Sequence, residues 1–257
     1  MAMADVTVLG AGIFGLSVAW ACARRGARVR VIDPNGVGAG CSGGLVGALA
    51  PHVPEQCNEK KAFQFESLVI AEGFWGEVEA VSGLSSGYAR LGRLQPVAEG
   101  AALELARARA VSAAMLWQGQ AALLALDRRD APQLFADAVH VVPHGDGPVA
   151  VGSTSEREYD DPVGTDAALE ALIARARAAV PALRDAPVIA RWAGLRPRAR
   201  SRAPVLGAHP LFPAQFIANG GFKIGFGMAP KVGQVMADLM LEGRDGIPEG
   251  FRPESCL

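Results

Sequence analysis

Short apolar runs and one stretch with helical spacing alternate over the first 33 residues. Residues 6–9 and 27–32 are rich in β-branched side chains and predict short strands, the first of them buried. Residues 16–25 between them carry the apolar spacing of a helix. The order strand, helix, strand within so short a length predicts two parallel strands joined by a crossover helix.

Four further segments have the apolar spacing of helices. Thr165 is the expected N-cap of one of them. Ala229, Pro230 and Lys231 are expected to open the last one, because proline is favoured in a first helical turn. The four predicted helices cover residues 59–81, 101–117, 166–179 and 231–241.

Shorter runs with strand character lie between these helices. The segment 139–153 predicts a hairpin that turns at Gly145-Asp146-Gly147. Further strands are expected within 88–97, where a turn follows, and at 188–195 and 216–218. Helices and strands that alternate along the chain make an α/β protein the expected fold class.

A glycine-rich turn, Gly10-Ala11-Gly12-Ile13-Phe14-Gly15, connects the first strand to the first helix. The first glycine permits a tight turn, the second lets backbone approach a pyrophosphate, and the third lets helix and strand pack closely. The N–H groups at the helix start attract phosphate, and Asp33 is placed to accept hydrogen bonds from ribose hydroxyls. The motif predicts a dinucleotide site and suits FAD and NAD alike. The alternative is a glycine-punctuated unit that binds nothing.

Composition narrows the class of protein. The chain has 257 residues, half of them hydrophobic, which is enough for one large domain or two small ones with a sizeable core. A formal net charge of -1 gives no field that would attract nucleic acid or an anionic membrane. Apart from the N-terminal run, which the glycine pattern explains, no stretch approaches the apolar length of a transmembrane helix.

The cysteines and histidines do not form a metal-binding pattern. The four cysteines, Cys22, Cys41, Cys57 and Cys256, are scattered without a CxxC pair. No histidine has an acidic or cysteine partner at metal-ligand spacing, so no metal is expected. Unpaired cysteines of this kind fit a reducing compartment, and we therefore expect a cytoplasmic protein.

Motifs at both ends of the chain together resemble the D-amino-acid oxidase and glycine oxidase family of FAD-dependent oxidoreductases. The N-terminal resemblance covers residues 6–51 and includes the segment 42–51, which looks like the family's second flavin-contacting loop. Farther on, 145–154 looks like the family's substrate-domain hairpin. Residues 192–197, Trp-Ala-Gly-Leu-Arg-Pro, are similar to its WxGxRP segment, and 219–230 to its last flavin-binding turn.

The resemblance implies FAD as the cofactor and a Rossmann-like FAD-binding domain. This domain would be discontinuous and incomplete, covering residues 1–82 and 190–257, with a reduced α+β substrate domain at 83–189. The residues expected to contact FAD come from the glycine turn, the second loop and the last turn: Gly10, Gly12, Ile13, Phe14, Gly15, Asp33, Ser42, Gly43, Gly44, Gly47, Ala48, Leu49, Gly220, Gly221, Phe222, Lys223, Gly225 and Met228.

Part of the family pattern is missing from the middle of the chain. In the family, a segment after the substrate domain returns to the nucleotide domain and supplies two strands. Here Leu116-Trp117-Gln118-Gly119-Gln120 joins an early helix directly to the strand that should follow that segment. About a hundred residues are absent, a small domain's worth of chain. The expected sheet therefore has strands 6–9, 27–32 and 216–218 with a gap where their neighbours should pair. We expect that the chain can form a homo-oligomer through this unpaired edge.

Substrate-binding residues follow from the same resemblance. Arg196 occupies the motif arginine and is the first candidate to hold a substrate carboxylate, because a guanidinium fork suits that group. Arg198 is the second candidate, and the alternative is that both belong to a solvated basic stretch. Lys223 stands where a cation would stabilise reduced flavin, or else is an exposed turn lysine.

The resulting hypothesis is an FAD-dependent oxidoreductase that oxidises the C–N bond of a small amino acid or amine, with hydride transfer to flavin N5. Oxygen or another electron acceptor would reoxidise the flavin. A first alternative is an internally deleted, impaired remnant that binds FAD weakly or not at all. A second is an oxidase of an amine carried by a modified tRNA base, which the lack of a basic stripe disfavours.

Overall fold

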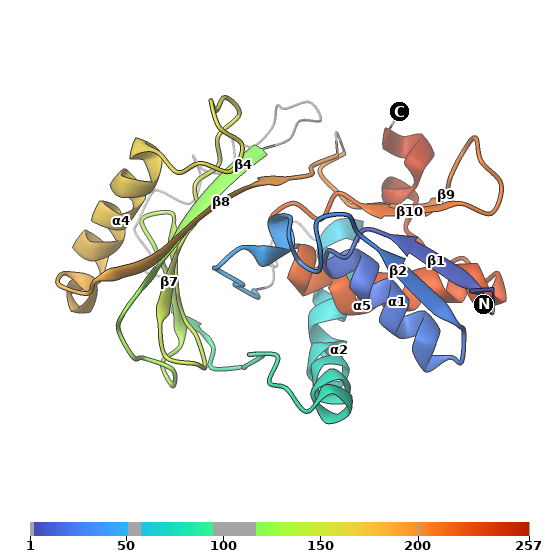
Figure 1. Ribbon diagram of the computed structural model, residues 1–257, viewed down its shortest axis with the longest axis horizontal. Coiled ribbons are helices and arrows are strands. Elements are labelled where there is room, and N and C mark those ends of the chain that lie inside the picture. The colour runs from blue at the N-terminus through green and yellow to red at the C-terminus, as the bar shows by residue number, and fades with distance from the viewer. Residues whose placement is uncertain (1–2, 51–57, 95–116, 200, 257) are drawn as a thin grey trace. The chain divides into compact units, whose positions relative to one another are not determined.

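The computed structural model describes residues 3–50, 58–94, 117–199 and 201–256, and the statements below concern these residues (Figure 1). The chain divides into two compact units. Unit 1 comprises Met1–Gly43, Leu49–Ser86 and Arg196–Leu257, and unit 2 comprises Gly44–Ala48 and Gly87–Leu195. No helix in the described ranges is both long and apolar enough to cross a membrane.

Unit 1 begins with the predicted strand–helix–strand unit. Strand β1 (Val6–Leu9) pairs in parallel with β2 (Val29–Ile32), and helix α1 (Ile13–Arg24) connects them. Val6 is paired with Val29, so the first residues of the two strands lie opposite each other. A crossover helix is what parallel pairing requires, and the sequence prediction for this region is confirmed.

Three helices pack together in unit 1 and hold its core. Helix α1 contacts α5 (Gly225–Glu242), which in turn contacts α2 (Glu59–Ser82). The side chain of Asn58 caps α2 by accepting a hydrogen bond from the Lys61 N–H, 3.0 Å away. The buried side chains that join these elements include Val6, Phe14, Val18, Cys22, Phe63, Leu206, Met228, Val232, Met236 and Phe251.

The C-terminal part of unit 1 also contains an antiparallel pair and two short 3-10 helices. Strands β9 (Val205–Ala208) and β10 (Phe216–Asn219) pair with each other, and the 3-10 helices η3 (Glu249–Phe251) and η4 (Pro253–Cys256) follow α5. Among the described strands β10 pairs only with β9 and β1 only with β2, so no hydrogen-bonded pairing links strand 216–218 to β1 and β2, where the sequence predicted a gap. Backbone groups of β10 find their partners in the preceding strand instead of in a distant one.

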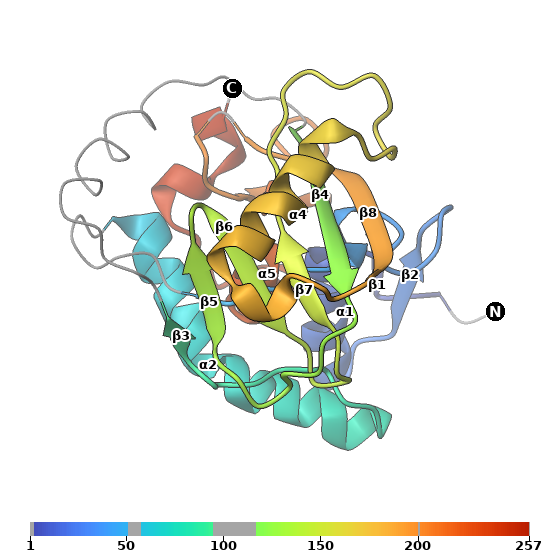
Figure 2. The ribbon, with the colours of Figure 1, turned by 90° about the vertical axis from the view of Figure 1, so that its left-hand side faces the viewer.

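In its described residues, unit 2 consists of a six-stranded sheet with helix α4 on one face. Its strand order is β3-β5-β6-β7-β4-β8, and Figure 2 shows α4 lying across one face. Val139, Val141, Val149 and Val151 pack beneath α4 on the residues Leu169, Leu172 and Ile173. The elements are β3 (Arg93–Leu94), β4 (Trp117–Leu124), β5 (Gln133–Ala136), β6 (Val139–Pro143), β7 (Val149–Gly152), α4 (Ala167–Ala179), the 3-10 helix η2 (Pro181–Leu183) and β8 (Val188–Arg196).

The predicted hairpin in unit 2 is confirmed. Strands β6 and β7 pair antiparallel, with Pro143 opposite Val149, and the Gly147 N–H donates to the His144 carbonyl across the turn. Strand β4 then pairs with β7, so the segment around the junction near Trp117 belongs to the sheet of unit 2. Neither β4 nor β5 replaces a lost strand of unit 1.

A buried polar network fixes the start of β4. The fully buried Gln120 side chain donates to Asp166 Oδ1 at 2.9 Å and accepts from the Asp166 N–H at 3.0 Å. Its backbone N–H donates to Thr154 Oγ1 at 2.8 Å. Buried polar groups that are satisfied in this way add to fold specificity. The chain just after the predicted junction is therefore well fitted into unit 2.

Two predicted helix ends and one predicted strand need correction. The N-cap of α4 is Asp166 rather than Thr165, because the Asp166 carboxylate accepts from the Ala168 N–H at 2.8 Å. Trp117, expected to end a helix, begins strand β4, and the remainder of that helix, 101–116, lies outside the described residues. Within the segment 88–97, where a strand was predicted, only the two residues of β3 form a strand among the described residues. Residues 95–97 lie outside the described residues.

The last helix begins earlier than predicted. Helix α5 starts at Gly225, and Pro230 lies inside it, where its missing N–H costs one helical hydrogen bond. Tertiary packing outweighs the weak helix propensity of glycine here. A Cβ on Gly233 would lie 2.5 Å from the Ser17 carbonyl oxygen of α1, so glycine allows α1 and α5 to approach closely.

Candidate functional site

The turn between β1 and α1 has the geometry that its glycines predict. Gly10 adopts a φ of 105°, in the region that side chains rarely adopt. A Cβ on Gly15 would collide with the Gly10 carbonyl oxygen, so only glycine fits where the helix packs on the turn. Gly12 is the N-cap of α1, and a Cβ there would lie 3.2 Å from Ser42 Oγ.

Two side chains hold this turn in place. The Asp33 carboxylate accepts from the Ala11 N–H at 2.8 Å through Oδ2 and from the Asn35 N–H at 2.9 Å through Oδ1. Ser42, in the 3-10 helix η1 (Cys41–Gly43), accepts from the Ile13 N–H at 2.9 Å. Other N–H groups of the first helical turn have no acceptor within the helix and suit an anion, as a pyrophosphate site requires.

Through these hydrogen bonds Asp33 stabilises the turn, in addition to its predicted contact with ribose. The N–H donors of Ala11 and Asn35 hold the pKa of the Asp33 carboxyl below its ordinary value. Asp33 therefore remains an anion at neutral pH. Its contribution to stability is complete above about pH 4 and is lost as the pH falls through the lowered folded-state pKa.

We predict that Asp33→Ala weakens nucleotide binding by about tenfold, because it frees the Ala11 N–H and loosens the turn. Asp33→Asn retains one acceptor oxygen and should lose less affinity. Titration with ADP and with FAD, followed by calorimetry, measures both effects. Wild-type affinity in Asp33→Ala would show that the turn keeps its shape without this carboxylate.

The predicted last turn lies directly against the first helix. A Cβ on Gly221 would lie 2.9 Å from Phe14 Cζ and 2.9 Å from the Cα of Gly225. A Cβ on Gly225, in turn, would lie 3.5 Å from Ile13 Cγ2. The starts of α1 and α5 therefore meet, and the structure brings the first and last predicted cofactor motifs together.

The end of β8 is held against this turn. The Phe222 N–H donates to the Pro197 carbonyl oxygen at 3.1 Å. Arg196, just before Pro197, is buried, whereas the exposed Lys223 places its ammonium 5.9 Å from the centre of the Phe222 ring. The Arg198 guanidinium lies 5.0 Å from the same ring centre. Cationic side chains thus surround the turn, and the burial of Arg196 excludes a fully solvated stretch.

Cys41 belongs to this neighbourhood, although no sequence motif predicts it. Burial raises the pKa of the Cys41 thiol, and the nearby positive charge of Arg196 partly opposes that rise. The thiol is therefore neutral at pH 7 and acts as a small apolar surface beside Arg196. Residue spacing could not reveal the contact, because the two positions are distant in sequence.

The second predicted loop is split between the units. Gly44, Gly47 and Ala48 belong to unit 2, whereas Leu49 belongs to unit 1. In unit 2, Val46 packs on β7, since a Cβ on Gly152 would collide with Val46 Cγ2. Gly220, with a φ of 81°, leads into the last turn, and Met228 is fully buried inside α5. A contact between Met228 and a cofactor stays a prediction.

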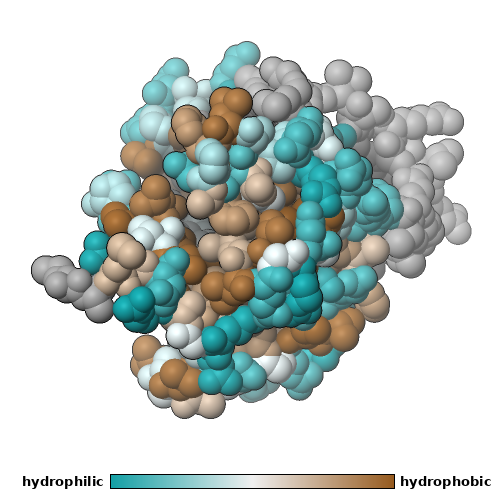
Figure 3. Space-filling view, turned by 90° about the vertical axis from the view of Figure 1, so that its right-hand side faces the viewer, coloured by the Kyte–Doolittle hydropathy of each residue, from teal (hydrophilic) through white to brown (hydrophobic). Residues whose placement is uncertain are grey.

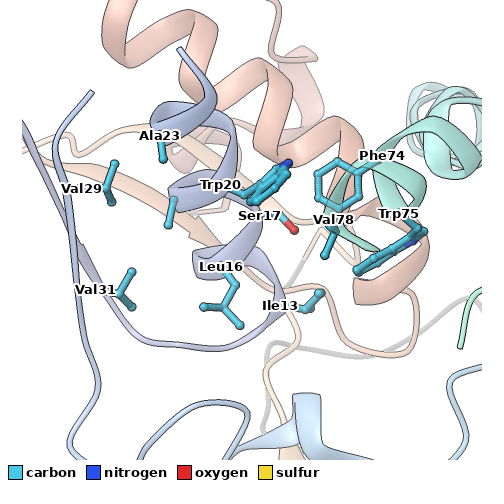
Figure 4. A pocket seen from close by; sticks show the side chains of 11 residues that line it. Ile13, Leu16, Ser17, Trp20, Ala23, Val29, Val31, Phe74, Trp75 and Val78 are labelled. Carbon is cyan, nitrogen blue, oxygen red and sulfur yellow. The ribbon is translucent and has the colours of Figure 1, made fainter. Parts of the chain in front are cut away.

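Unit 1 also contains an apolar pocket beside α1, with a volume of about 470 Å³. Figure 4 shows side chains from α1, β2 and α2 pointing into it. Trp20 lines it from α1 and Trp75 from α2. The other lining residues are Ile13, Leu16, Ser17, Ala19, Ala23, Val29, Val31, Phe74 and Val78. The pocket has no counterpart among the sequence predictions.

Comparison with known proteins agrees with this geometry. The sequence model of the FAD dependent oxidoreductase family matches residues 5–135 and 117–239. The chain belongs to this family. The family uses FAD, as the sequence predicted, and the α/β fold with a Rossmann-like unit is confirmed. The two matched segments overlap at 117–135, the region in which the junction is predicted.

Several curated relatives of this chain are glycine oxidases. The chain is 36% identical to glycine oxidase from Pseudomonas aeruginosa over 126 residues, which are 48% of this chain and 34% of that protein. It is 31% identical to glycine oxidase from Bacillus subtilis over 108 residues, 42% of this chain and 29% of that protein. The aligned part of the chain thus spans about a third of the length of the relatives it matches.

Solved structures with the same fold cover the chain from end to end. Glycine oxidase from Geobacillus kaustophilus has a TM-score of 0.80 at 17% identity and covers 97% of this chain and 98% of its own. Iminodiacetate oxidase from Chelativorans sp. has a TM-score of 0.84 at 18% identity, covering 96% and 98%. At these identities the match establishes the shared fold.

This chain is shorter than the curated relatives that it matches. Since 126 residues are 34% of the Pseudomonas aeruginosa protein, that protein has about 370 residues, about 110 more than the 257 here. The structural match to glycine oxidase from Geobacillus kaustophilus covers 97% of this chain and 98% of that chain. This agrees with the predicted loss of a segment after about Trp117.

Proposed function

We propose that this protein is an FAD-dependent oxidoreductase that oxidises the C–N bond of a small amino acid or amine. The observation that carries the proposal is the meeting of three elements in unit 1: the glycine turn of α1, the last turn at Gly221, and the end of β8 with buried Arg196. Family membership and the glycine oxidase relatives support the same class of reaction.

The residues of unit 1 fit the phosphate half of FAD. Gly10 gives the turn its positive φ, a Cβ on Gly15 would collide with the Gly10 carbonyl oxygen, and the start of α1 offers N–H donors to a pyrophosphate. Ser42 and Asp33 keep this turn in shape. Bound FAD would accept a hydride from the substrate carbon, which is chemistry that no side chain supplies.

Substrate positioning is assigned to Arg196. A buried guanidinium has little water to solvate it and gains most from a carboxylate partner in bidentate geometry. A carboxylate held there fixes the substrate, so that only one end of it can reach the reacting centre. Lys223 and Arg198 add positive charge around Phe222, which would stabilise negative charge that develops during oxidation.

We predict that Arg196→Ala removes a charge-assisted pair worth about 1.5–3 kcal/mol, hence about ten- to a hundredfold in kcat/KM for an acidic substrate. The loss should largely vanish with an amine that lacks a carboxylate. Steady-state kinetics on a matched pair such as an amino acid and its decarboxylated amine measures it. Equal losses with both substrates would assign Arg196 a structural role.

The experiment that tests the proposed function is the visible spectrum of the purified protein, reconstituted with added FAD, during anaerobic addition of amino acids and amines. Bleaching of a flavin spectrum by one of them, and its return with oxygen or another acceptor, supports the proposal. We further propose that the predicted boundaries, 1–82 with 190–257 and 83–189, separate the FAD-binding and substrate domains.

A second candidate function is a remnant that binds FAD weakly. It is favoured by one observation, the open apolar pocket beside α1 and β2 in a chain about 110 residues shorter than its Pseudomonas aeruginosa relative. A folded, colourless protein that binds ADP without turnover would support this candidate over the enzyme.

A further inference from the structure

A buried glutamine of α2 holds the end of the second predicted flavin loop in unit 1. Gln64 is only 2% exposed, and its Nε2 donates to the Ala50 carbonyl oxygen at 3.3 Å. Removing a carboxamide from water costs free energy, which a hydrogen bond to a backbone carbonyl offsets. An apolar side chain would pack at this position without that cost. The glutamine therefore specifies the path of the loop as well as filling space.

The same carboxamide lies beside the start of α5. A Cβ on Gly227, in the first turn of α5, would lie 3.5 Å from Gln64 Nε2 and 3.9 Å from Leu49 Cδ2. Gly227 lies between Gly225 and Met228, two of the residues predicted to contact FAD. Gln64 is therefore next to two predicted flavin-contacting segments, the end of the second loop and the start of the last helix.

A second hydrogen bond holds the beginning of the same loop. Ser42 Oγ accepts from the Ile13 N–H at 2.9 Å, which attaches the loop to α1. Gln64 attaches it to α2 through Ala50, so the predicted flavin contacts within 43–49 lie between two fixed points. A loop that is held at both ends loses less conformational entropy when it orders around a ligand, and binding is tighter as a result.

We propose that Gln64 is a positioning residue that holds the second loop in place for the flavin half of FAD. The inference rests on the proposed FAD-dependent function. The ADP half is expected at the glycine turn, whose shape Asp33 maintains through the Ala11 N–H. Gln64 contacts the second loop instead. Loss of its amide should therefore weaken binding of FAD and leave binding of ADP unchanged.

The test compares FAD and ADP in Gln64→Met. Methionine resembles glutamine in length and lacks the donor to the Ala50 carbonyl, so the variant fills the same space without the hydrogen bond. Calorimetric titration of the apo-protein should give an FAD affinity about tenfold below that of the wild type and an ADP affinity equal to it. Unchanged FAD affinity, or equal losses for FAD and ADP, would overturn the proposal.

Ser67→Ala is the matched control on the same helix. The fully buried Ser67 accepts from the Lys231 N–H of α5 through Oγ at 3.2 Å, so this variant also removes a hydrogen bond of a buried α2 side chain. It should lower Tm without changing the ratio of the FAD and ADP affinities. The same change of ratio in Ser67→Ala as in Gln64→Met would reduce Gln64 to a structural role and overturn the proposal.

Limited proteolysis of the apo-protein tests the attachment of the loop without any cofactor. Elastase cuts beside small aliphatic residues, which fill the segment 43–50, and mass spectrometry locates the cut. Cutting in this segment should be faster in Gln64→Met than in the wild type and in Ser67→Ala. Equal rates, in a wild type that binds FAD, would overturn this inference alone. A wild type that binds ADP but no FAD would contradict the proposed function and, with it, the role of Gln64.

Gln64→Leu is the second variant should Gln64→Met fail to fold. Leucine is a strong helix former and also lacks the donor, so the same selective loss of FAD affinity is expected. If neither variant folds while Ser67→Ala does, Gln64 is needed for folding itself and the proposal is overturned.

Discussion

Gly12→Val is expected to lower the affinity for FAD and for ADP at least tenfold while the protein stays folded. Gly12 caps α1, and a Cβ at this position would lie 3.2 Å from Ser42 Oγ. The branched side chain of valine therefore fills the space that a pyrophosphate needs. It also displaces Ser42, whose Oγ accepts a hydrogen bond from the Ile13 N–H. One lost charge-assisted hydrogen bond is worth about 1.5–3 kcal/mol.

Gly40→Val is the matched control for this effect. Gly40 lies in the glycine-rich loop after β2, just before η1, a Cβ there would have no atom within 4 Å, and its φ is outside the left-handed region. The control should bind ADP as the wild type does. Calorimetric titration of apo-protein with ADP and with FAD compares the three proteins. Unchanged affinity in Gly12→Val would remove the turn from the cofactor site.

The parts of the site that follow from local sequence were predictable. Glycines at positions 10, 12 and 15, between a β-branched run and a helix, predict a tight turn that leads directly into the helix. The structure has this turn. Asp33 was placed correctly at the end of β2, but its hydrogen bonds to Ala11 and Asn35 were not predictable. They depend on the path of the turn in space rather than on residue type.

The remaining errors come from contacts between distant segments. Helix α5 extends back to Gly225 because its glycines fit against α1, and local propensity cannot register such packing. Strand β10 pairs with β9, although its length and character also suited the sheet of β1 and β2. The hydrogen bond from Lys60 to the Arg202 carbonyl oxygen joins positions 142 residues apart, and no pattern of residue spacing predicts a contact over that separation in sequence.

The second large effect concerns the shortened interior of the chain. We expect the purified protein to retain little FAD and to self-associate. Among the described strands, β1 and β2 pair only with each other, and each leaves an edge without a neighbour. Apolar side chains on these strands are exposed, with Leu9 80%, Ile32 45% and Val31 39% accessible. Figure 3 shows apolar residues interspersed with hydrophilic ones on a face of the molecule.

Unpaired backbone groups at the strand edges and exposed apolar side chains are the physical reasons for the expected loss of FAD and for self-association. The pocket of about 470 Å³ beside α1 and β2 exposes Trp20, Trp75 and Val31, which a further layer of chain would cover. An unsatisfied polar group costs about 1–3 kcal/mol when buried, against a total domain stability of about 5–15 kcal/mol. An edge of this kind invites pairing with a second copy, because exposed strand edges are templates for association.

Size-exclusion chromatography with light scattering, together with the ratio of flavin to protein absorbance, tests this expectation. Val31→Lys places a charge on the exposed strand β2 and should shift the chain towards monomer at concentrations where the wild type associates. Ala171→Lys, on the exposed face of α4 in unit 2, adds the same charge away from that strand and should leave association unchanged. A stable wild-type monomer that copurifies with stoichiometric FAD would contradict the prediction, and would mean that the shortened chain closes its sheet and covers its cofactor by itself.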